Sequence, residues 1–369
     1  MTRFDDAFGP LAVATRSGYD ESLFHGAAVA LRPDGSVIAA VGDPTVSVYP
    51  RSALKPLQAM AMTELGLALP SRLLAIVCAS HDGCEAHTAA VRQVLALFDL
   101  DEADLRNTPS YPYDDRARDD AIREGVAPSS LQQNCSGKHA GMLATCRVNG
   151  WPVADYLAAS HPLQVAITAS IEGHGSPVHH VGIDGCGAPT HAIGLDDLAR
   201  AFAGIASGRA AVADAMTSHP ELVGGATRDV TVWMRAIPGL VTKDGADGVM
   251  AGALPDGRTF ALKVAGGSDA ARRAVTAEAL RVLDIDVDGA LGEALDATRP
   301  IVSGHGLEVG RIEALPWTAP PGRTDGIPDP RSGDVHLRRV EPRRSARAQG
   351  HRRESVQVHV PRHGHVHRR

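Results

Sequence analysis

Lysine is rare in this chain, so the positions that keep it are informative. Of 37 lysines and arginines together, only four are lysines: Lys55, Lys138, Lys243 and Lys263. Arginine replaces lysine well as a solvated charge, but only a lysine amine readily gives up its proton to become a base, a nucleophile or a metal ligand. The four lysines are therefore candidates for chemistry.

Two of them follow a nucleophilic side chain by three residues, in Ser52-Ala-Leu-Lys55 and Cys135-Ser-Gly-Lys138. Residues three apart on a helix share one face, so the Lys55 amine is expected to reach the Ser52 hydroxyl and accept its proton. The same Ser-x-x-Lys spacing occurs in β-lactamases and penicillin-binding proteins.

The other two lysines lie late in the chain. Lys263 ends a β-rich run, so a second lysine is expected to arrive at the site from a terminal strand. Lys243 lies beside the turn Asp244-Gly245, and its interpretation stays open between chemistry and a surface charge.

β-rich runs near both ends flank turn sequences, at 26–31 and 36–41 and again at 248–254 and 259–264, and this pattern predicts two hairpins. Helical spacing of apolar residues lies between and after them, at residues 52–65, 86–98, 138–148, 163–172, 195–206 and 268–283. We therefore expect an α+β fold, in which the two ends build one antiparallel sheet and a helical region lies between.

Composition restricts the class of protein. The chain has 369 residues, 44% of them apolar, which suffices for a large core. Its start lacks an apolar leader and no run is long enough to span a membrane, so a cytoplasmic protein without a membrane partner is expected. Five scattered cysteines do not suggest a disulfide framework; free thiols or metal ligands are expected.

The last part of the chain differs in composition. From residue 319 onward there are 12 arginines against 5 acidic residues, and no apolar periodicity. We predict a catalytic domain at 1–315 and a disordered Arg/His/Pro-rich tail at 316–369, so a chain that ends at Leu315 is expected to fold normally. Metal or nucleic-acid binding by the tail is the alternative to a passive extension; no nucleic-acid partner is expected.

Five motifs in order along residues 8–313 resemble the asparaginase II family of the rhizobial type: YPRSALKPLQ (49–58), CASHDG (78–83), NCSGKHAGM (134–142), GIDGCGAP (182–189) and KDGADG (243–248). The resemblance implies a serine β-lactamase-like fold, a homodimer, and hydrolysis of L-asparagine to L-aspartate and ammonia. It implies two Ser-Lys pairs, Ser52 with Lys55 and Ser80 with Lys263. Cys84 departs from the pattern, where a small or acidic residue is expected.

The resemblance also implies a metal site, usually zinc, at Cys135, Lys138 and Cys186. Two thiolates and one amine would leave a fourth tetrahedral position open, with one zinc per chain. The alternative is a pair of buried free cysteines with a structural lysine.

Asparagine is a zwitterion, so its binding needs a guanidinium for the carboxylate and a carboxylate for the ammonium. Arg51 and Asp184 are the expected pair; the alternative is that Arg51 is only a surface charge and Asp184 only a turn residue. His139 is expected to support substrate binding. Two other functions stay open: a different Ser-Lys amidohydrolase, and a non-catalytic protein that binds an amino acid or zinc.

Overall fold

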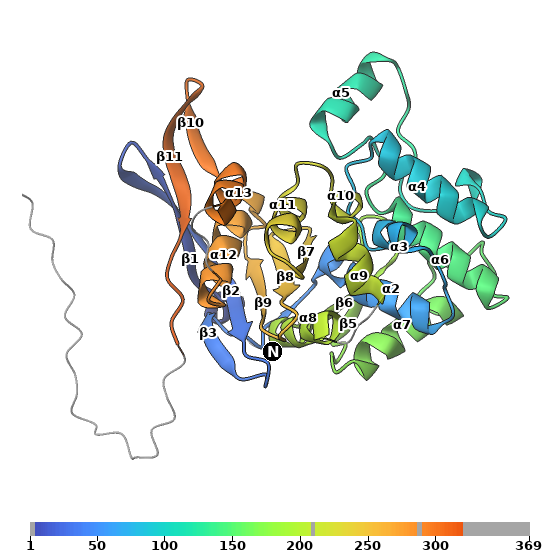
Figure 1. Ribbon diagram of the computed structural model, residues 1–369, viewed down its shortest axis with the longest axis horizontal. Coiled ribbons are helices and arrows are strands. Elements are labelled where there is room, and N and C mark those ends of the chain that lie inside the picture. The colour runs from blue at the N-terminus through green and yellow to red at the C-terminus, as the bar shows by residue number, and fades with distance from the viewer. Residues whose placement is uncertain (1–3, 208–210, 286–289, 320–369) are drawn as a thin grey trace, which may run out of the picture. The chain divides into compact units, whose positions relative to one another are not determined.

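The computed structural model describes residues 4–207, 211–285 and 290–319. Within them, both ends of the sequence build one antiparallel sheet (Figure 1). Its strand order is β10-β11-β1-β2-β9-β8-β7, and β3 also pairs with β2. The strands are β1 (Gly9–Arg16), β2 (Tyr19–Leu31), β3 (Val37–Val41), β7 (Val241–Gly245), β8 (Val249–Ala253), β9 (Thr259–Val264), β10 (Ile301–Gly304) and β11 (Leu307–Ala314).

Both predicted hairpins are confirmed. β2 pairs with β3 around a turn in which Gly35 has φ 80°, a backbone conformation that glycine adopts without strain. β8 pairs with β9, with Ala253 opposite Thr259. The two hairpins join through β2 and β9, which brings the early and late parts of the chain into one sheet.

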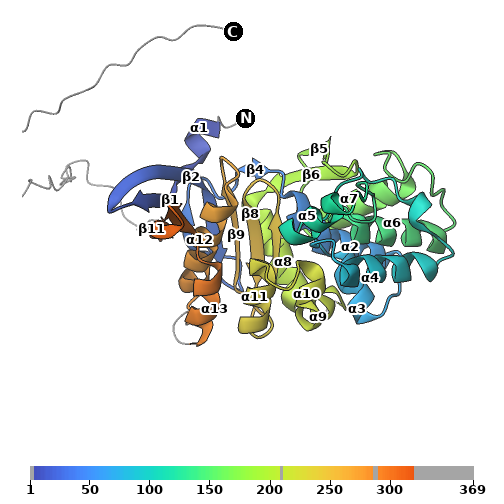
Figure 2. The same cartoon turned by 90° about the horizontal axis from the view of Figure 1, so that it is seen from above.

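A helical region lies beside the sheet (Figure 2). It contains the 3-10 helix η1 (Arg51–Leu54), α2 (Lys55–Glu64), α3 (Ser71–Val77), α4 (Glu85–Ala96), α5 (Asp115–Arg123), α6 (Ser136–Val148) and α7 (Pro162–Gly173). α6 is buried on all sides from Ser136 to Cys146, as expected for a helix that packs against α2, α3, α4 and α7. A small sheet of β4 (Ser47–Val48), β6 (Pro189–Gly194) and β5 (His180–Ile183) lies next to it.

The remaining helices follow the small sheet in the sequence. They are α8 (Leu195–Ser207), α9 (Ala211–Ser218), α10 (Pro220–Val223), α11 (Asp229–Ala236), α12 (Asp269–Val282) and α13 (Ala290–Thr298), while α1 (Phe4–Ala7) precedes the main sheet. α8 and α12 pack on β2, β8 and β9 through apolar faces that include Phe202 and Val275. The predicted α+β class, and each of the six predicted helices, is confirmed. Among the described helices, none is long and apolar enough to cross a membrane.

The predicted boundary at Leu315 differs from the structure by a few residues. Trp317 is only 8% exposed and belongs to the core, and the Thr318 carbonyl accepts a hydrogen bond from the Ala40 amide at 3.1 Å. The apolar indole explains the difference, because it buries a large apolar area in the core, whereas its described neighbours Pro316 and Thr318 are exposed. The rest of the predicted tail, residues 320–369, lies outside the described residues.

This packing changes the expected effect of truncation. A chain that ends at Leu315 should be less stable than one that ends at Ala319, by about 3 kcal/mol, which is typical for removal of a buried tryptophan. Denaturant unfolding of the two chains measures the difference, and Trp317→Ala in the full-length protein should reproduce it. Equal unfolding midpoints for the two truncated chains would show that Trp317 contributes nothing to stability.

Candidate active site

The Ser80 hydroxyl lies between two lysine amines. Ser80 is in the short connection between α3 and α4, and it is only 4% exposed. Lys55 Nζ donates to Ser80 Oγ at 3.1 Å and to the Ala79 carbonyl at 2.5 Å, and Lys243 Nζ lies 2.9 Å from the same Oγ. The first residue of α2 and the middle of β7 therefore meet at one serine.

This pairing differs from the predicted one for Ser52. Lys55 Nζ points inward from the start of α2 to the connection after α3, so it contacts Ser80 rather than Ser52. Ser52 lies one turn earlier in η1, where its side chain is partly exposed, and within the described part of the chain its hydroxyl has no hydrogen bond. The three-residue spacing does place Ser52 and Lys55 near each other in the chain, but packing of α2 against the connection after α3 directs the Lys55 amine to Ser80.

The predicted pair of Ser80 with Lys263 is also different. Lys263, near the end of β9, is only partly buried and donates to the Asp247 carbonyl. Lys243, fully buried in β7, takes the place beside Ser80 that was expected for Lys263. The scarcity of lysine, applied equally to all four positions, was the signal that could have found it.

Lys243 has an environment that favours the neutral amine. Burial lowers its pKa to about 8, and the positive charges of Lys55 and Arg228 act in the same direction against the attraction of Asp244. The Asp244 carboxylate accepts a hydrogen bond from Lys243 and forms an ion pair with Arg228 at 2.7 Å. Arg228 forms a second ion pair with Asp82 at 3.3 Å. At pH 7 about a tenth of Lys243 is then unprotonated, far more than for a lysine of ordinary pKa.

Two glycines permit these close approaches. A Cβ on Gly225 would overlap the Asp82 carboxylate, and a Cβ on Gly245 would overlap the Pro50 carbonyl. β7 and its lysine can therefore lie directly against η1, and Asp82 can reach Arg228.

Cys135, Lys138 and Cys186 form a second buried cluster. Cys135 immediately precedes α6, Lys138 is in its first turn, and Cys186 lies between β5 and β6. Lys138 Nζ donates to Cys186 Sγ at 3.3 Å. Contact with Cys186 lowers the pKa of Cys135 well below its usual value, and the Lys55 and Lys138 amines add to that shift. The cluster therefore contains a thiolate beside a second thiol and Lys138, whose pKa the two sulfurs raise against the effect of burial.

A metal ion at this cluster would need the lysine as a ligand. Among the described residues, His, Cys, Asp and Glu alone form no group of three that could hold a metal. The three residues that the sequence singled out do lie together, with all side chains nearly inaccessible to solvent.

Arg51 and Asp184 are also brought together. Arg51 Nε donates to Asp184 Oδ1 at 2.6 Å, and Arg51 Nη1 donates to Asp247 Oδ2 at 2.6 Å. Arg51 has φ 53°, a left-handed conformation that costs a non-glycine residue free energy and is often retained at functional sites. It lines a cavity of about 320 Å³ together with Asp247 and Lys263.

Residues 12–314, most of the chain, match the family model for L-asparaginase II. The chain belongs to the L-asparaginase II family. It is accordingly an asparaginase-type amidohydrolase with a small-molecule substrate.

Two solved structures similar to this L-asparaginase II family member have low sequence identity to it. A β-lactamase from Mycobacterium bovis is 16% identical, with a TM-score of 0.36, and the match covers 69% of this chain and 94% of that one. A protein described as Mglu is 16% identical with a TM-score of 0.31, over 72% of this chain and 69% of that one. No curated protein sequence matches the chain.

His139 of the family member is buried in α6. Its Nδ1 lies 2.8 Å from the Tyr156 hydroxyl, while its Nε2 has no partner among the described residues. Burial lowers the pKa of His139 well below its usual value, so the ring is neutral. The predicted supporting role in substrate binding stays a prediction.

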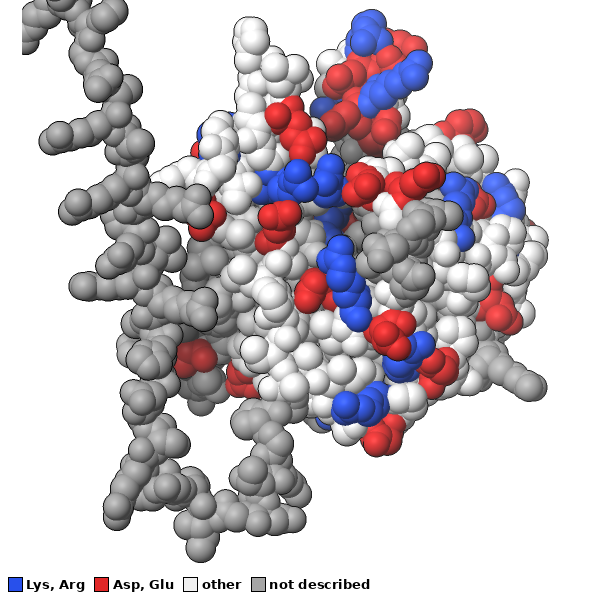
Figure 3. Space-filling view, turned by 60° about the vertical axis from the view of Figure 1, so that its left-hand side comes forward, with Lys and Arg blue, Asp and Glu red and all other residues white. Residues whose placement is uncertain are grey.

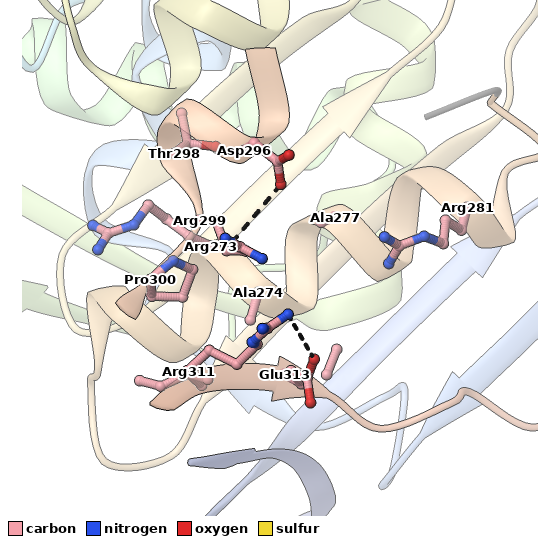
Figure 4. Close-up of a pocket in the computed structure, with 12 residues that line it drawn as sticks. Arg273, Ala274, Ala277, Arg281, Asp296, Thr298, Arg299, Pro300, Arg311 and Glu313 are labelled. Carbon is pink, nitrogen blue, oxygen red and sulfur yellow. Dashed lines mark ion pairs between the residues drawn. The ribbon is translucent and has the colours of Figure 1, made fainter. Parts of the chain in front are cut away.

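The cavity drawn in Figure 4 is not lined by the residues of the candidate active site. It has a volume of about 390 Å³ and lies among α12, the end of α13 and β11, where Arg299 pairs with Asp296 and Arg311 with Glu313. None of the predicted site residues lines it. Acidic and basic side chains are also interspersed over the face of the molecule in Figure 3.

Proposed function

We propose that this protein hydrolyses L-asparagine to L-aspartate and ammonia, with Ser80 as the nucleophile. The observation that carries the proposal is the contact of two lysine amines with one buried serine hydroxyl. Family membership supports the reaction class.

In this proposal Lys243 is the general base. Its neutral amine accepts the Ser80 proton while Oγ attacks the side-chain amide carbon of asparagine. The resulting ammonium returns that proton to the leaving nitrogen, so that the C–N bond breaks and ammonia departs from an aspartyl ester. Water then attacks the ester with Lys243 again as base, and aspartate leaves as Ser80 regains its proton.

Lys55 orients the nucleophile. Its hydrogen bonds to the Ala79 carbonyl and Ser80 Oγ fix the hydroxyl relative to Lys243. A second amine also supplies a donor beside the reacting oxygen, where negative charge develops during attack.

The Arg51 cluster is proposed to bind the zwitterionic end of asparagine. Among the described residues Arg51 Nη2 has no hydrogen-bond partner, so it can donate to the substrate carboxylate, while the carboxylates of Asp184 and Asp247 attract the substrate ammonium. Ser52 directly follows Arg51, and Lys263 lines the same cavity. We therefore propose that both contact substrate there, alongside the expected support from His139.

Zinc is proposed at Cys135, Lys138 and Cys186. The donor set fits in residue type and burial, because a thiol of lowered pKa, a second thiol and a lysine converge in a buried place. The two sulfurs raise the pKa of Lys138, so zinc would have to displace its proton on binding. Bound zinc would supply a Lewis acid or a structural cross-link between α6 and the loop before β6. We also propose a homodimer, which the resemblance of the five motifs supports, and a cytoplasmic location.

Ammonia release from L-asparagine by the purified protein tests the proposed function. Ser80→Ala should lower the rate of release by about 1,000-fold while leaving the protein folded. L-Glutamine under the same conditions measures the side activity, and no ammonia release from asparagine would reject the proposed substrate.

The pH dependence of kcat/KM should reflect Lys243. The neutral amine is the active form and its pKa is lowered to about 8, so activity should rise with pH from about 6 and level off above about 9. Initial rates of ammonia release across this range give the profile. A profile that is flat through pH 8 would exclude Lys243 as the base.

A further inference from the structure

The exposed thiol of Cys84 and the buried ring of His87 form a pair that the proposed reaction does not use. Cys84 directly precedes α4, and its Sγ lies 3.0 Å from His87 Nδ1. Cys84 is exposed, whereas the other four cysteines, Cys78, Cys135, Cys146 and Cys186, are buried. Reagents in solution therefore reach one thiol of the native protein first.

The hydrogen bonds of His87 orient its ring so that Nδ1 can accept the thiol proton. His87 Nε2 lies 2.9 Å from the Glu221 carbonyl oxygen, which can only accept, so Nε2 carries a hydrogen. In the neutral ring Nδ1 therefore has the lone pair and faces the thiol of Cys84. Transfer of the thiol proton to Nδ1 then gives a thiolate and an imidazolium without rotation of either side chain.

Other surrounding groups favour this ion pair. Cys84 is the N-cap residue of α4, and the positive end of the helix dipole stabilises a thiolate there. The hydrogen bond from His87 lowers the pKa of Cys84. Burial lowers the pKa of His87, but the Cys84 contact and the Glu221 carbonyl outweigh it and raise the pKa overall.

The charged groups around His87 do not cancel the effect. Asp82 favours the imidazolium, and the stacked ring of His81, 5.1 Å away, is neutral because burial lowers its pKa well below the usual value. On α10, Glu221 presents its carbonyl, and its carboxylate lies 3.9 Å from His219 and 3.3 Å from Arg235. Glu85, next to Cys84, is the opposing negative charge, and it is solvated.

We propose that Cys84 is an oxidative modification site that reacts with hydroperoxides, and that its oxidation slows hydrolysis at Ser80. The thiolate attacks one peroxide oxygen, forming an S–O bond as the O–O bond breaks. Sulfur loses two electrons and the peroxide gains them. The departing hydroxide takes the His87 Nδ1 proton, so that hydrogen peroxide yields a sulfenic acid and water.

The connection to Ser80 is short and rigid. Ser80 and Cys84 lie in the same loop, where Gly83 has φ 82° and leaves no room for a Cβ against Pro112 and Gln132. Oxidation converts the thiolate to a neutral sulfenic acid, so the 3.0 Å contact loses its ion-pair attraction and releases His87, which stacks on His81. His81 directly follows Ser80, so the release of His87 reaches the nucleophile; this second step rests on the proposed function.

The test treats the full-length protein with hydrogen peroxide and traps sulfenic acid with dimedone, followed by peptide mass spectrometry and ammonia release. At pH 7, Cys84 should be trapped at least tenfold faster than a matched exposed thiol, introduced by Ser22→Cys in a Cys84→Ser background. Peroxide should reduce turnover at least fivefold, and a thiol reductant should restore it. Cys84→Ser should keep its activity before and after treatment.

Each possible result tests a different part of the proposal. Trapping no faster than at the Ser22→Cys thiol, or trapping unaffected by His87→Gln, overturns the modification site. Rapid trapping with unchanged turnover overturns the link to Ser80. Dimedone trapping needs no substrate, so it reports on the Cys84 thiol even if the protein does not hydrolyse asparagine. A lack of asparagine hydrolysis would count against the proposed function alone.

Discussion

Ser80→Ala and Lys243→Met should each lower kcat for ammonia release by about 1,000-fold, which is about 4 kcal/mol in the activation barrier. Both changes remove the same step, the transfer of the serine proton to a neutral amine. Since the two residues act as one unit, the double variant should be no slower than either single one. Initial rates at saturating asparagine, with circular dichroism to verify folding, make the measurement.

Matched variants separate the two candidate serines and lysines. Ser52→Ala and Lys263→Met should retain kcat much better, because neither side chain contacts Ser80. Lys55→Arg should reduce turnover strongly, since a guanidinium cannot occupy the same buried position between Ala79 and Ser80. If Ser52→Ala is as inactive as Ser80→Ala, Ser52 is the nucleophile or an equal partner in the reaction.

Elemental analysis should find about one zinc per chain in protein prepared with ample zinc and washed with a weak chelator. Cys135→Ser and Cys186→Ser should each lose it, because two remaining donors do not hold zinc in a closed site. Lys138→Met should weaken retention in the same way, which tests the unusual amine ligand directly.

Cys146→Ala is the matched control for the zinc measurement. It removes a buried thiol from the same helix, α6, at a position outside the cluster, so its zinc content should equal that of the unaltered protein. Protein that contains no zinc under these conditions would leave Cys135 and Cys186 as buried free thiols, the alternative reading of the motif.

Local patterns predicted most of the fold. The Pro-Asp-Gly turns between β-rich runs gave both hairpins, because turn geometry and strand pairing are determined within about fifteen residues. Apolar spacing gave the six helices for the same reason. The burial of Trp317 was not predicted, because a single indole in a polar segment produces no apolar periodicity, although it buries enough area to pack by itself.

The site was predicted in its residue types and less well in its pairing. Cys135, Lys138 and Cys186 meet, and Arg51 meets Asp184, as expected. The partner of Lys55 depends on how α2 packs against the connection after α3, which no spacing within the Ser-x-x-Lys motif contains. The position of Lys243 beside Ser80 was not predicted for a similar reason: the adjacent Asp244-Gly245 suggested a surface turn, whereas the lysine lies inside a fully buried strand.

The pairing of the two chain ends has a consequence for synthesis of the protein. Ala12 is opposite Ala314 and Ala28 is opposite Leu262, so the N-terminal strands leave the ribosome long before their partners exist. Pairings this distant in sequence close late and slowly. The helical region can form first, but the unpaired edge of β2 stays open to other chains until β9 arrives. Aggregation during expression should therefore depend on how quickly the second half is translated.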